Sequence, residues 1–361
     1  MSAGAGERPG ASPGAAPAGG RPGDSGTAAR SRVAVLGAGS WGTTLALHLS
    51  RRGASVALWE FDAARARRLS LTRESLPFLP GHRLPDSITA TSDLAEALGG
   101  AEVAVIAVPS SALASLAARV VAAPQAPPLW VSATKGIDEE TGLTPRPLFS
   151  RLAGIPEERI VVLAGPSFAL EVAAGKPTAI LAAGSDEPAC VEAQRLFSGD
   201  TLRVYTSPDP LGVEIGVSLK NVIAIAAGVA AGLDLGSNGL GALITRGLAE
   251  ITRLGVRLGA RPETFLGLAG IGDLVITSTS TLSRNYRVGF ALARGEQLEQ
   301  ILNEIGMVAE GVRTCRSAIR LAERLGVDLP IARQVHAVLY EGLDPRRAVL
   351  ELMSRPLRAE F

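Results

Sequence analysis

A glycine-rich turn at residues 37–42 stands between an apolar run and a helical pattern, and this order admits few folds. Residues 33–36 are all apolar, as is typical of a strand buried on both faces. Residues 43–52 predict a helix that ends at Gly53, and residues 55–59 predict a second strand. The unit of strand, turn, helix and strand is about thirty residues long, which is the size of one βαβ crossover.

The turn has the spacing G-x-G-x-x-G, and each glycine has a separate physical role. Gly37 permits the tight turn, Gly39 lets the backbone approach a pyrophosphate, and Gly42 lets the helix pack closely on the strand. The N-terminus of the helix then offers unpaired N–H groups and a partial positive charge to the phosphates. The alternative is a glycine turn with a purely structural role. Because this turn directly follows the first strand of the unit and opens the helix, the sequence predicts a dinucleotide-binding site.

The residues after the second strand bear on the choice between NAD and NADP. An acidic side chain about twenty residues beyond the turn accepts hydrogen bonds from the ribose hydroxyls and repels a 2′-phosphate. Glu60 occupies that place and favours NAD over NADP. Arg65, Arg67 and Arg68 argue the other way if one of them neutralises the 2′-phosphate; otherwise they form a solvated helix face. Phe61 either packs near the adenine or belongs to the core.

Further strands alternate with helical patterns as far as residue 207. They are expected at residues 103–108, 129–133, 160–164, 178–182 and 202–205. Such alternation predicts an α/β fold with a doubly wound, mostly parallel sheet of the Rossmann type, covered by helices.

The character of the chain changes after Pro208, where helical patterns continue without a convincing strand. Helices are expected at residues 211–231, 239–258, 261–268, 284–294, 313–325 and 331–340. We therefore divide the chain into three parts. They are an Ala/Gly/Pro-rich tail that is expected to be disordered (1–30), a dinucleotide-binding Rossmann domain (31–207) and an all-helical substrate-binding and catalytic domain (208–361).

Composition excludes several classes of protein. There are 36 basic and 35 acidic residues, so the net charge of +1 lacks the basic footprint of a nucleic-acid binder. Cys190 and Cys315 lie far apart, which implies no disulfide framework and a reducing cytoplasm. The three histidines show no metal-ligand spacing, so no metal is expected. The apolar stretch at residues 222–233 is too short for a membrane span and predicts a buried helix.

Polar residues stand at the ends of two later strands, where ligands of open α/β sheets bind. Lys135 follows the strand at 129–133, and Ser167 follows the strand at 160–164 within Gly165-Pro166-Ser167. A lysine in such a loop is usually solvated. At the carboxyl edge of the sheet it can also meet a substrate.

Lys220 and Asn221 interrupt a strongly apolar helical stretch. Burial of an unpaired ammonium lowers its pKa, and a lysine tuned toward neutral pH can act as a general base. Alternatively, Lys220 extends to solvent from the edge of the helix. The residues alone do not decide between these two interpretations.

A third polar cluster combines Asp273 and Thr277 with Ser283-Arg284-Asn285. Arg284 can hold a phosphate with a bidentate fork, while Asp273 and Asn285 can fix hydroxyl or amide groups. Asp and Asn are also favoured helix caps, so a structural role stays open.

Taken together, these residues resemble the bacterial NAD(P)-dependent glycerol-3-phosphate dehydrogenase family over residues 33–352. The motifs follow in the family's order: GAGSWGT (37–43), ATKG (133–136), GPSFA (165–169) with Glu171, Lys220-Asn221, ALITRG (242–247), GIGDL (270–274), SRN (283–285) and Ala309-Glu310-Gly311. Leu240 and Ile271 depart mildly from the family's pattern, and the tail is not part of it.

The resemblance implies reversible hydride transfer between NAD(P)H and dihydroxyacetone phosphate, which gives sn-glycerol 3-phosphate for phospholipid synthesis. It implies that Lys220 is the catalytic acid/base at the C2 oxygen and that Lys135 binds and polarises the substrate. The substrate-binding positions that it implies are Lys135, Gly165, Ser167, Lys220, Asn221, Asp273, Ser283, Arg284 and Asn285. Beside Gly37, Gly39, Gly42 and Glu60, the cofactor-binding positions that it implies are Ser40, Trp41, Phe61, Lys135, Ala169, Arg284, Val308 and Glu310.

The resemblance alone further implies a homodimer, whereas composition predicts a cytoplasmic protein without a membrane span or a nucleic-acid partner. Two alternatives are weighed against it. Another Rossmann dehydrogenase that acts on a hydroxy acid predicts a carboxylate site and leaves Lys135, Lys220 and the SRN cluster unexplained. A non-catalytic NAD(H) sensor predicts a damaged catalytic set, whereas every member is present.

Overall fold

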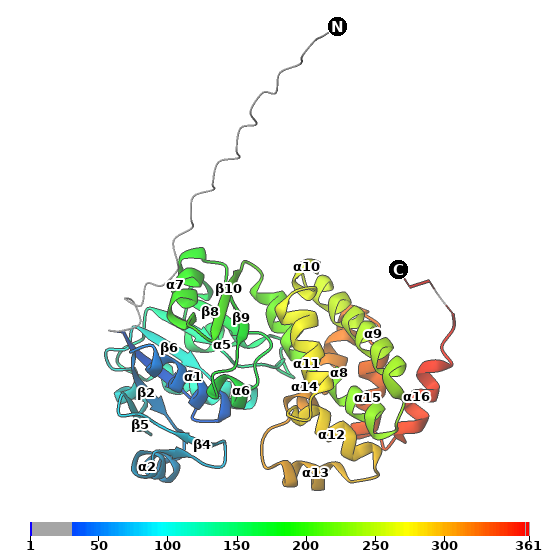
Figure 1. Ribbon diagram of the computed structural model, residues 1–361, viewed down its shortest axis with the longest axis horizontal. Helices are drawn as coiled ribbons and strands as arrows, with labels where there is room; N and C mark the ends of the chain where they lie inside the picture. The colour runs from blue at the N-terminus through cyan, green and yellow to red at the C-terminus, as the bar shows by residue number, and fades with distance from the viewer. Residues whose placement is uncertain (2–30, 358, 361) are drawn as a thin grey trace.

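The computed structural model describes Met1, residues 31–357 and residues 359–360, in two domains that lie side by side (Figure 1). A sheet flanked by helices forms one domain, and a bundle of helices forms the other. The tail predicted at residues 1–30 lies outside the described residues except for Met1.

The first domain is built on an eight-stranded sheet with the order β10-β9-β8-β7-β6-β1-β2-β5. Its strands are β1 (Arg32–Leu36), β2 (Ser55–Trp59), β5 (Ile88–Thr91), β6 (Val103–Ile106), β7 (Leu129–Ser132), β8 (Ile160–Ala164), β9 (Thr178–Ala183) and β10 (Leu202–Ser207). All neighbouring pairs are parallel except β8 and β9, which are antiparallel. The predicted Rossmann-type, mostly parallel sheet is confirmed.

Helices cover both faces of this sheet, and a small hairpin of β3 (Glu74–Ser75) and β4 (Leu79–Arg83) lies beside it. The helices are α1 (Ser40–Arg51), α2 (Ala63–Thr72), α3 (Leu94–Leu98), α4 (Leu113–Val121), α5 (Pro145–Ala153), α6 (Ala169–Ala173) and α7 (Glu187–Phe197). Val33 and Val35 of β1 pack into one apolar core, and Ala34 and Leu36 pack into another. The central strand is apolar at every one of these positions because it is buried on both faces.

The second domain contains helices only, among the residues described after β10. They are α8 (Pro210–Gly232), α9 (Gly236–Arg257), α10 (Pro262–Phe265), α11 (Asp273–Thr279), α12 (Arg284–Ala293), α13 (Leu298–Ile305), α14 (Glu310–Leu325), α15 (Pro330–Tyr340) and α16 (Pro345–Met353). The helix α8 packs against α9, α11, α12 and α14. The predicted all-helical second half is confirmed.

By length and composition, α8 is the one single helix in the described ranges that could cross a membrane, but 83% of its most apolar window is buried inside the protein. The segments Pro262–Thr279 and Arg284–Ala293 meet at a bend of 47° and are long and apolar enough to cross a membrane only if they are counted as one span. The helix predicted at residues 211–231 is α8, and its second half, the apolar stretch at residues 222–233, is mostly buried, as predicted.

The helix predicted at residues 261–268 is wrong. Only Pro262–Phe265 is α-helical, and a π-helical turn at Leu268–Gly272 follows before α11 begins. Gly270 has the non-helical angles φ −97° and ψ −106°, and a Cβ there would lie 1.9 Å from the carbonyl oxygen of Phe265. This turn places the N-terminus of α11 beside α8.

Candidate active site

The glycine turn between β1 and α1 has the backbone geometry that its spacing predicts. Gly37 has φ +116°, and a Cβ there would lie 2.7 Å from the carbonyl oxygen of Ala107. A Cβ on Gly42 would lie 1.8 Å from the carbonyl oxygen of Gly37. A Cβ on Gly39 would meet nothing within 4 Å, so open space lies at the N-terminus of α1. This space fits a pyrophosphate, because the first N–H groups of a helix have no partner within the helix.

Residues from both domains border the glycine turn. The hydroxyl of Ser40 donates a hydrogen bond to the carbonyl oxygen of Phe78 at 2.7 Å, and its Oγ lies 3.8 Å from the Sδ of Met307. Trp41 is half-buried and packs against one of the two sheet cores. Val308 follows Met307 and is 41% exposed. Ser40 and the 307–308 segment, which are far apart in sequence, therefore meet at one site.

Glu60 lies just beyond β2, and only 6% of its surface is exposed. Its Oε2 accepts a hydrogen bond from Nη2 of Arg65 at 2.8 Å, and its Oε1 accepts one from the backbone N–H of Asp62 at 3.1 Å. Arg67 and Arg68 are exposed. The solvated-face interpretation thus fits Arg67 and Arg68, whereas Arg65 is part of the site around Glu60.

Phe61 is 61% exposed, so the alternative that it belongs to the core is wrong. Its ring meets Trp59 edge-on at a centroid distance of 6.4 Å, and the guanidinium of Arg119 lies 4.6 Å from the centroid of Phe61. An exposed aromatic ring beside Glu60 provides a flat apolar surface that an adenine can contact.

Two lysines from different domains meet at one buried carboxylate. Nζ of Lys220 on α8 donates to Oδ1 of Asp273 at 2.6 Å and to Oγ1 of Thr277 at 2.7 Å. Nζ of Lys135, from the loop after β7, lies 3.5 Å from Oδ2 of the same carboxylate. Lys220 is 5% exposed, so it does not extend to solvent, and the burial interpretation is confirmed.

The surroundings change the acidity of Lys220. Burial lowers the pKa of Lys220 to about 7; the charge of Asp273 raises it, and the nearby Lys135 lowers it further. Since burial outweighs the attraction of the carboxylate, Lys220 can be either charged or neutral near pH 7. The two site lysines and Lys176 are the only lysines among the 361 residues, against 33 arginines, and arginine cannot be tuned in this way.

A chain of hydrogen bonds between amide groups joins Asn221, the neighbour of Lys220, to Asn285 and Gly311. Nδ2 of Asn285 donates to Oδ1 of Asn221 at 3.0 Å, and the backbone N–H of Gly311 donates to Oδ1 of Asn285 at 2.9 Å. A Cβ on Gly311 would lie 2.6 Å from the carbonyl oxygen of Asn221. The chain therefore fixes α8, α12 and α14 to one another. Asn285 is not the N-cap of its own helix, and its Oδ1 instead satisfies an N–H at the start of α14.

The SRN cluster and Glu310 stand at the starts of α12 and α14. Ser283 is the N-cap of α12 and accepts a hydrogen bond from the backbone N–H of Tyr286 at 3.2 Å. Nη1 of Arg284 donates to the carbonyl oxygen of Val308 at 2.7 Å. Glu310 accepts a hydrogen bond from the hydroxyl of Ser110 at 3.0 Å, so α14 contacts the loop after β6.

The loop after β8 carries the GPSFA residues. Gly165 has φ +142°, and the hydroxyl of Ser167 donates to the Gly165 carbonyl oxygen at 3.0 Å. Ala169 begins α6, and its carbonyl oxygen accepts a hydrogen bond from the hydroxyl of Thr44 on α1 at 3.2 Å. A Cβ on Gly272 would lie 3.9 Å from Pro166, so this loop and the turn before Asp273 face each other across the domains.

Two residues in these contacts were given no role from the sequence. Thr277 holds Lys220 from the next turn of α11 after Asp273, and Ser110 holds Glu310. Ser110 stands shortly after β6, in the kind of strand-end position that drew attention to Lys135 and Ser167, and that signal could have identified it. Thr277 stands in the third polar cluster, but the pattern assigned it no role, since its contact with Lys220 depends on how α11 packs against α8.

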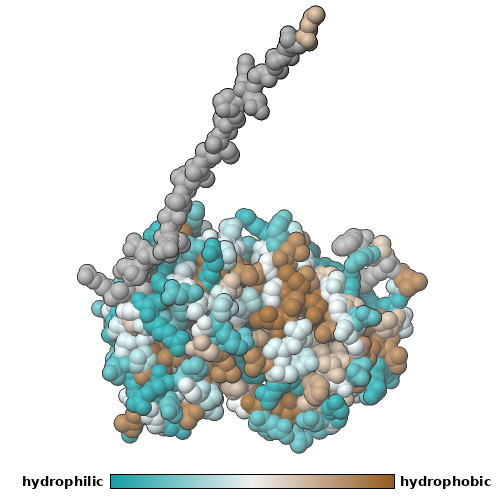
Figure 2. All heavy atoms as spheres, in the orientation of Figure 1, coloured by the Kyte–Doolittle hydropathy of each residue, from teal (hydrophilic) through white to brown (hydrophobic). Residues whose placement is uncertain are grey.

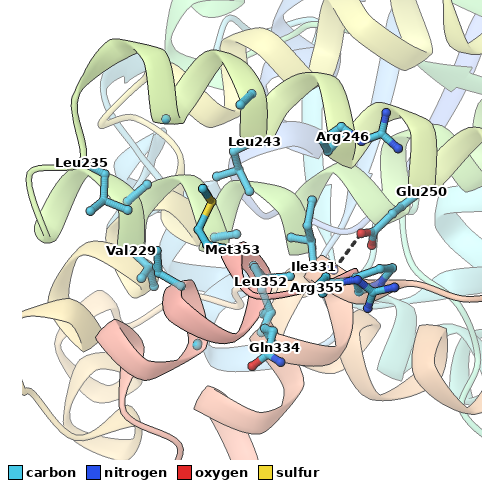
Figure 3. Close-up of a pocket in the computed structure, with 18 of the residues that line it drawn as sticks. Val229, Leu235, Leu243, Arg246, Glu250, Ile331, Gln334, Leu352, Met353 and Arg355 are labelled. Carbon is cyan, nitrogen blue, oxygen red and sulfur yellow. Dashed lines mark hydrogen bonds between the residues drawn. The ribbon is translucent and has the colours of Figure 1, made fainter. Parts of the chain in front are cut away.

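An apolar cavity of about 690 Å³ lies away from the lysines, between α8, α9, α15 and α16 (Figure 3). Its lining includes Leu243, Ile331 and Leu352, and the carboxylate of Glu250 accepts a hydrogen bond from the backbone N–H of Ile331 at its edge. None of the predicted catalytic, substrate or cofactor residues lines it. In the described part of the chain, no group of three or more His, Cys, Asp and Glu side chains is placed to hold a metal ion.

Comparison with known proteins supports the motif assignments. Residues 32–190 match a family model described as the N-terminus of NAD-dependent glycerol-3-phosphate dehydrogenase, and residues 209–350 match the model for its C-terminus. The chain is 48% identical over 332 residues to glycerol-3-phosphate dehydrogenase [NAD(P)+] of Geobacter sulfurreducens, covering 91% of this chain and 98% of that protein. It is 47% identical over 331 residues to the enzyme of the same name from Anaeromyxobacter sp. (strain K), covering 91% and 100%.

Solved structures are similar as well. The glycerol-3-phosphate dehydrogenase of Coxiella burnetii is similar with a TM-score of 0.85 and 37% identity, covering 90% of this chain and 99% of that one. A D-mandelate dehydrogenase solved with NADH has a TM-score of 0.56 at 13% identity, covering 86% and 98%. The second likeness concerns the fold alone.

Proposed function

The chain belongs to the NAD(P)-dependent glycerol-3-phosphate dehydrogenase family, and from this premise we propose how its own residues perform the reaction. The enzyme reversibly interconverts dihydroxyacetone phosphate and sn-glycerol 3-phosphate with NAD(P)H or NAD(P)+. A bound nicotinamide supplies or accepts the hydride at C2 of the substrate. The observation that carries the proposed mechanism is the pair of lysines, Lys135 and Lys220, at the buried carboxylate of Asp273.

Lys220 is the proposed acid/base. An ammonium has three N–H donors; Asp273 and Thr277 use two, which leaves one for the C2 oxygen of the substrate. During reduction, negative charge develops on that oxygen, an N–H bond of Lys220 breaks, and its proton moves to the oxygen. During oxidation, the neutral amine takes the proton of the hydroxyl as the hydride leaves. A pKa of about 7 suits both directions.

Lys135 and Asp273 have complementary roles in this proposal. The side chain of Lys135 is 22% exposed, and its ammonium stabilises the developing charge on the C2 oxygen. The carboxylate of Asp273 balances the two positive charges and holds the amines of both lysines in place. Removing either partner of such a buried pair leaves an uncompensated charge, so the three side chains act as a unit.

The substrate phosphate is assigned to the start of α12. Arg284 offers a planar fork, and the N-terminus of the ten-residue α12 offers N–H groups and a partial positive charge. Anchoring the phosphate there supplies binding energy remote from C2 and orients the carbonyl for transfer. By the family pattern we assign further substrate contacts to Gly165, Ser167, Asn221, Asp273, Ser283 and Asn285.

The cofactor is assigned to a row of positions that begins at the glycine turn. The open space at Gly39, the buried Glu60 and the exposed Phe61 fit a pyrophosphate, a ribose and an adenine in that order. Further contacts are proposed at Ser40, Trp41, Lys135, Ala169, Arg284, Val308 and Glu310. Neither a hydroxy-acid dehydrogenase nor a non-catalytic sensor explains why both lysines and the phosphate-binding cluster are present together.

An assay with the purified full chain tests the function directly. We expect oxidation of NADH or NADPH, followed by absorbance of the reduced cofactor, when dihydroxyacetone phosphate is added. Glyoxylate and pyruvate serve as control substrates that carry a carboxylate in place of the phosphate. Oxidation with the control substrates alone would support the hydroxy-acid alternative and exclude the proposed one.

Replacing Glu60 by alanine should shift cofactor preference toward NADPH. The substitution removes the buried negative charge that opposes a 2′-phosphate and releases Arg65, which now holds that carboxylate at 2.8 Å. We expect the ratio of kcat/KM for NADPH to kcat/KM for NADH to rise about tenfold, the equivalent of one charge-assisted hydrogen bond. The double variant Glu60→Ala, Arg65→Ala should lose most of this gain. An unchanged ratio in the single variant would remove Glu60 from the argument.

The two reaction directions should depend on pH in opposite ways. Reduction needs protonated Lys220, so its initial rate should fall as pH rises through about 7, whereas oxidation needs the neutral amine, so its initial rate should rise. Initial rates at saturating cofactor are the measurement, with Lys176→Ala as a variant that keeps both profiles because Lys176 lies on the surface, paired with Glu171. Profiles that move in the same direction would contradict the acid/base assignment.

We also propose that the enzyme is a cytoplasmic homodimer that supplies glycerol 3-phosphate for phospholipid synthesis. The family resemblance supports this assembly, and so does the surface: Figure 2 shows apolar residues grouped over α10 and α11, where Leu266 is 73% and Val275 is 39% exposed. The mass in solution, measured by light scattering, tests it; the mass of a single chain at micromolar concentration would exclude a stable dimer.

A further inference from the structure

Glu214 on α8 is a buried carboxylate that contacts the other domain. Its Oε2 accepts a hydrogen bond from the hydroxyl of Thr144 at 2.6 Å, and its Oε1 accepts one from the backbone N–H of Arg146 at 2.7 Å. Both donors lie at the start of α5, in the sheet domain. Glu214 is 2% exposed, so no solvent competes for these bonds.

This contact caps α5 from outside its own domain. Thr144 is the N-cap residue, but its side chain makes no capping hydrogen bond, and Pro145 has no N–H to donate. The N–H of Arg146 is therefore the first free donor of the helix, and Glu214 satisfies it. The guanidinium of Arg146 is engaged elsewhere, with the carbonyl oxygens of Ile160 and Glu157. A carboxylate at a helix N-terminus is also favoured by the helix dipole.

A second contact lies one turn further along the same face of α8. The hydroxyl of Ser218 accepts a hydrogen bond from the backbone N–H of Gly136 at 2.9 Å and lies 3.1 Å from the Gly136 carbonyl oxygen, to which it can donate. Residues four apart on a helix share a face, so Glu214 and Ser218 contact the sheet domain together. Gly136 directly follows Lys135. The helix thus holds residues 135–144, the Lys135 loop, near both of its ends.

We propose that Glu214 is a positioning residue for the reaction: by capping α5 from α8, it holds the Lys135 loop at a fixed distance from Lys220. Lys220 lies six residues after Glu214 on the same helix, about 9 Å along its axis. The capping carboxylate, the Ser218 contact and the acid/base are therefore parts of one rigid element. The inference rests on the proposed roles of Lys135 and Lys220.

The electrostatics of the site connect this position to the chemistry. Lys135 lowers the pKa of Lys220, and that effect depends on the distance between the two amines. If the cap is weakened, the Lys135 loop gains freedom, its repulsion of Lys220 decreases, and water reaches the site more easily. The weaker repulsion and the added water both raise the pKa of Lys220. The movement of the loop also displaces the Lys135 charge that stabilises the C2 oxygen.

Glu250 provides a matched control. It is another buried carboxylate, 5% exposed, and it accepts hydrogen bonds from the backbone N–H groups of Ile331 and Ala332 at the start of α15, which also begins with a proline (Figure 3). Burial raises the pKa of Glu214 and that of Glu250 to about 7. The two glutamates thus have the same chemistry at helix starts, but Glu250 caps a helix within the second domain and does not touch the Lys135 loop.

The experiment compares Glu214→Gln with Glu250→Gln in the full chain. Both variants are expected to fold, because glutamine has nearly the shape of glutamate, and both should lose similar thermal stability at pH 8, where carboxyls with a pKa of about 7 are mostly ionised in wild type. At that pH only Glu214→Gln should lower kcat for reduction, by up to about tenfold, with KM for NADH unchanged and the pH profile of reduction moved to higher pH.

A second measurement does not depend on activity. Since the chain has three lysines, [13Cε]lysine labelling gives three resonances, and the titration of Lys220 can be followed directly by NMR. Its midpoint should move to higher pH in Glu214→Gln and stay in place in Glu250→Gln. If wild-type protein did not reduce dihydroxyacetone phosphate, the proposed function would fail, while this comparison would still decide whether Glu214 sets the environment of Lys220.

The inference is overturned if the two glutamine variants have the same kcat and the same Lys220 titration. Should Glu214→Gln fail to fold, Thr144→Val is the second variant, because it removes one of the two hydrogen bonds and keeps the carboxylate. It should move kcat and the Lys220 midpoint in the same directions by smaller amounts. Wild-type values in Thr144→Val would then reject the positioning role.

Discussion

Replacement of Lys220 by alanine is expected to lower kcat for dihydroxyacetone phosphate reduction by about 10³-fold or more. The substitution removes the proposed proton donor, which lies 2.6 Å from Asp273 and 2.7 Å from Thr277, and also removes one of the two positive charges near the C2 oxygen. Lys220 makes no contact with the glycine turn or with Glu60, so the Kd for NADH should stay nearly unchanged. Stopped-flow single turnovers give the rate, and NADH fluorescence gives the Kd.

Lys176→Ala is the matched control for this prediction. It removes the remaining lysine of the chain, which is exposed and paired with Glu171 at 2.8 Å, so kcat should stay within about twofold of wild type. Retained turnover in Lys220→Ala would refute the acid/base assignment. A large rise in the Kd for NADH would instead show that the substitution had disturbed the proposed cofactor site.

Replacement of Asp273 by asparagine is expected to damage both catalysis and stability. Without the carboxylate, Lys220 and Lys135 repel each other with no balancing charge, and the loss of a partner from a buried ion pair costs about 3–5 kcal/mol. The pKa of Lys220 should fall, because the attraction of Asp273 is lost while burial and Lys135 still lower it. Less ammonium is then present at neutral pH, and kcat for reduction should fall by about 10²-fold.

Urea unfolding and the pH profile of reduction measure the two parts of this effect. Asp209→Asn is a suitable comparison, because Asp209 is a buried carboxylate that caps α8 at the N–H of Gly212 and has no contact with either lysine. It should lose stability and keep the wild-type pH profile. If Asp273→Asn also kept that profile, Asp273 would have no influence on Lys220, and the proposed catalytic unit would be wrong.

The sequence predicted the sheet better than the helical half of the chain, for a physical reason. Strands such as β1 are buried on both faces and therefore read as continuous apolar runs. The strand β5 was not predicted, because it has only four residues and two of them are threonines. In the helical half, Gly267, Gly270 and Gly272 interrupt the pattern around α11, and this element was missed. The short helices α13 and α16 were missed as well.

The chemistry of the site could be predicted only in part. The glycine turn, Lys135 and Lys220 were found from their places in the pattern. A lone lysine in an apolar helix is compatible with burial or with extension to solvent, and the choice depends on a partner 53 residues away, Asp273. The contacts of Thr277 and Glu214 could not be predicted for the same reason, since each joins two elements and no local pattern records it.

The helix α8 also has a consequence for how the chain folds. Val213 and Val217, near its start, are buried against Val162 and Ala183 of the sheet, while Ile223, further along, lies in the core of the helical domain. If either domain melted alone, half of this apolar helix would be exposed to water. The two domains should therefore melt in a single cooperative transition, with equal calorimetric and van't Hoff enthalpies, although the chain is far longer than the usual two-state protein.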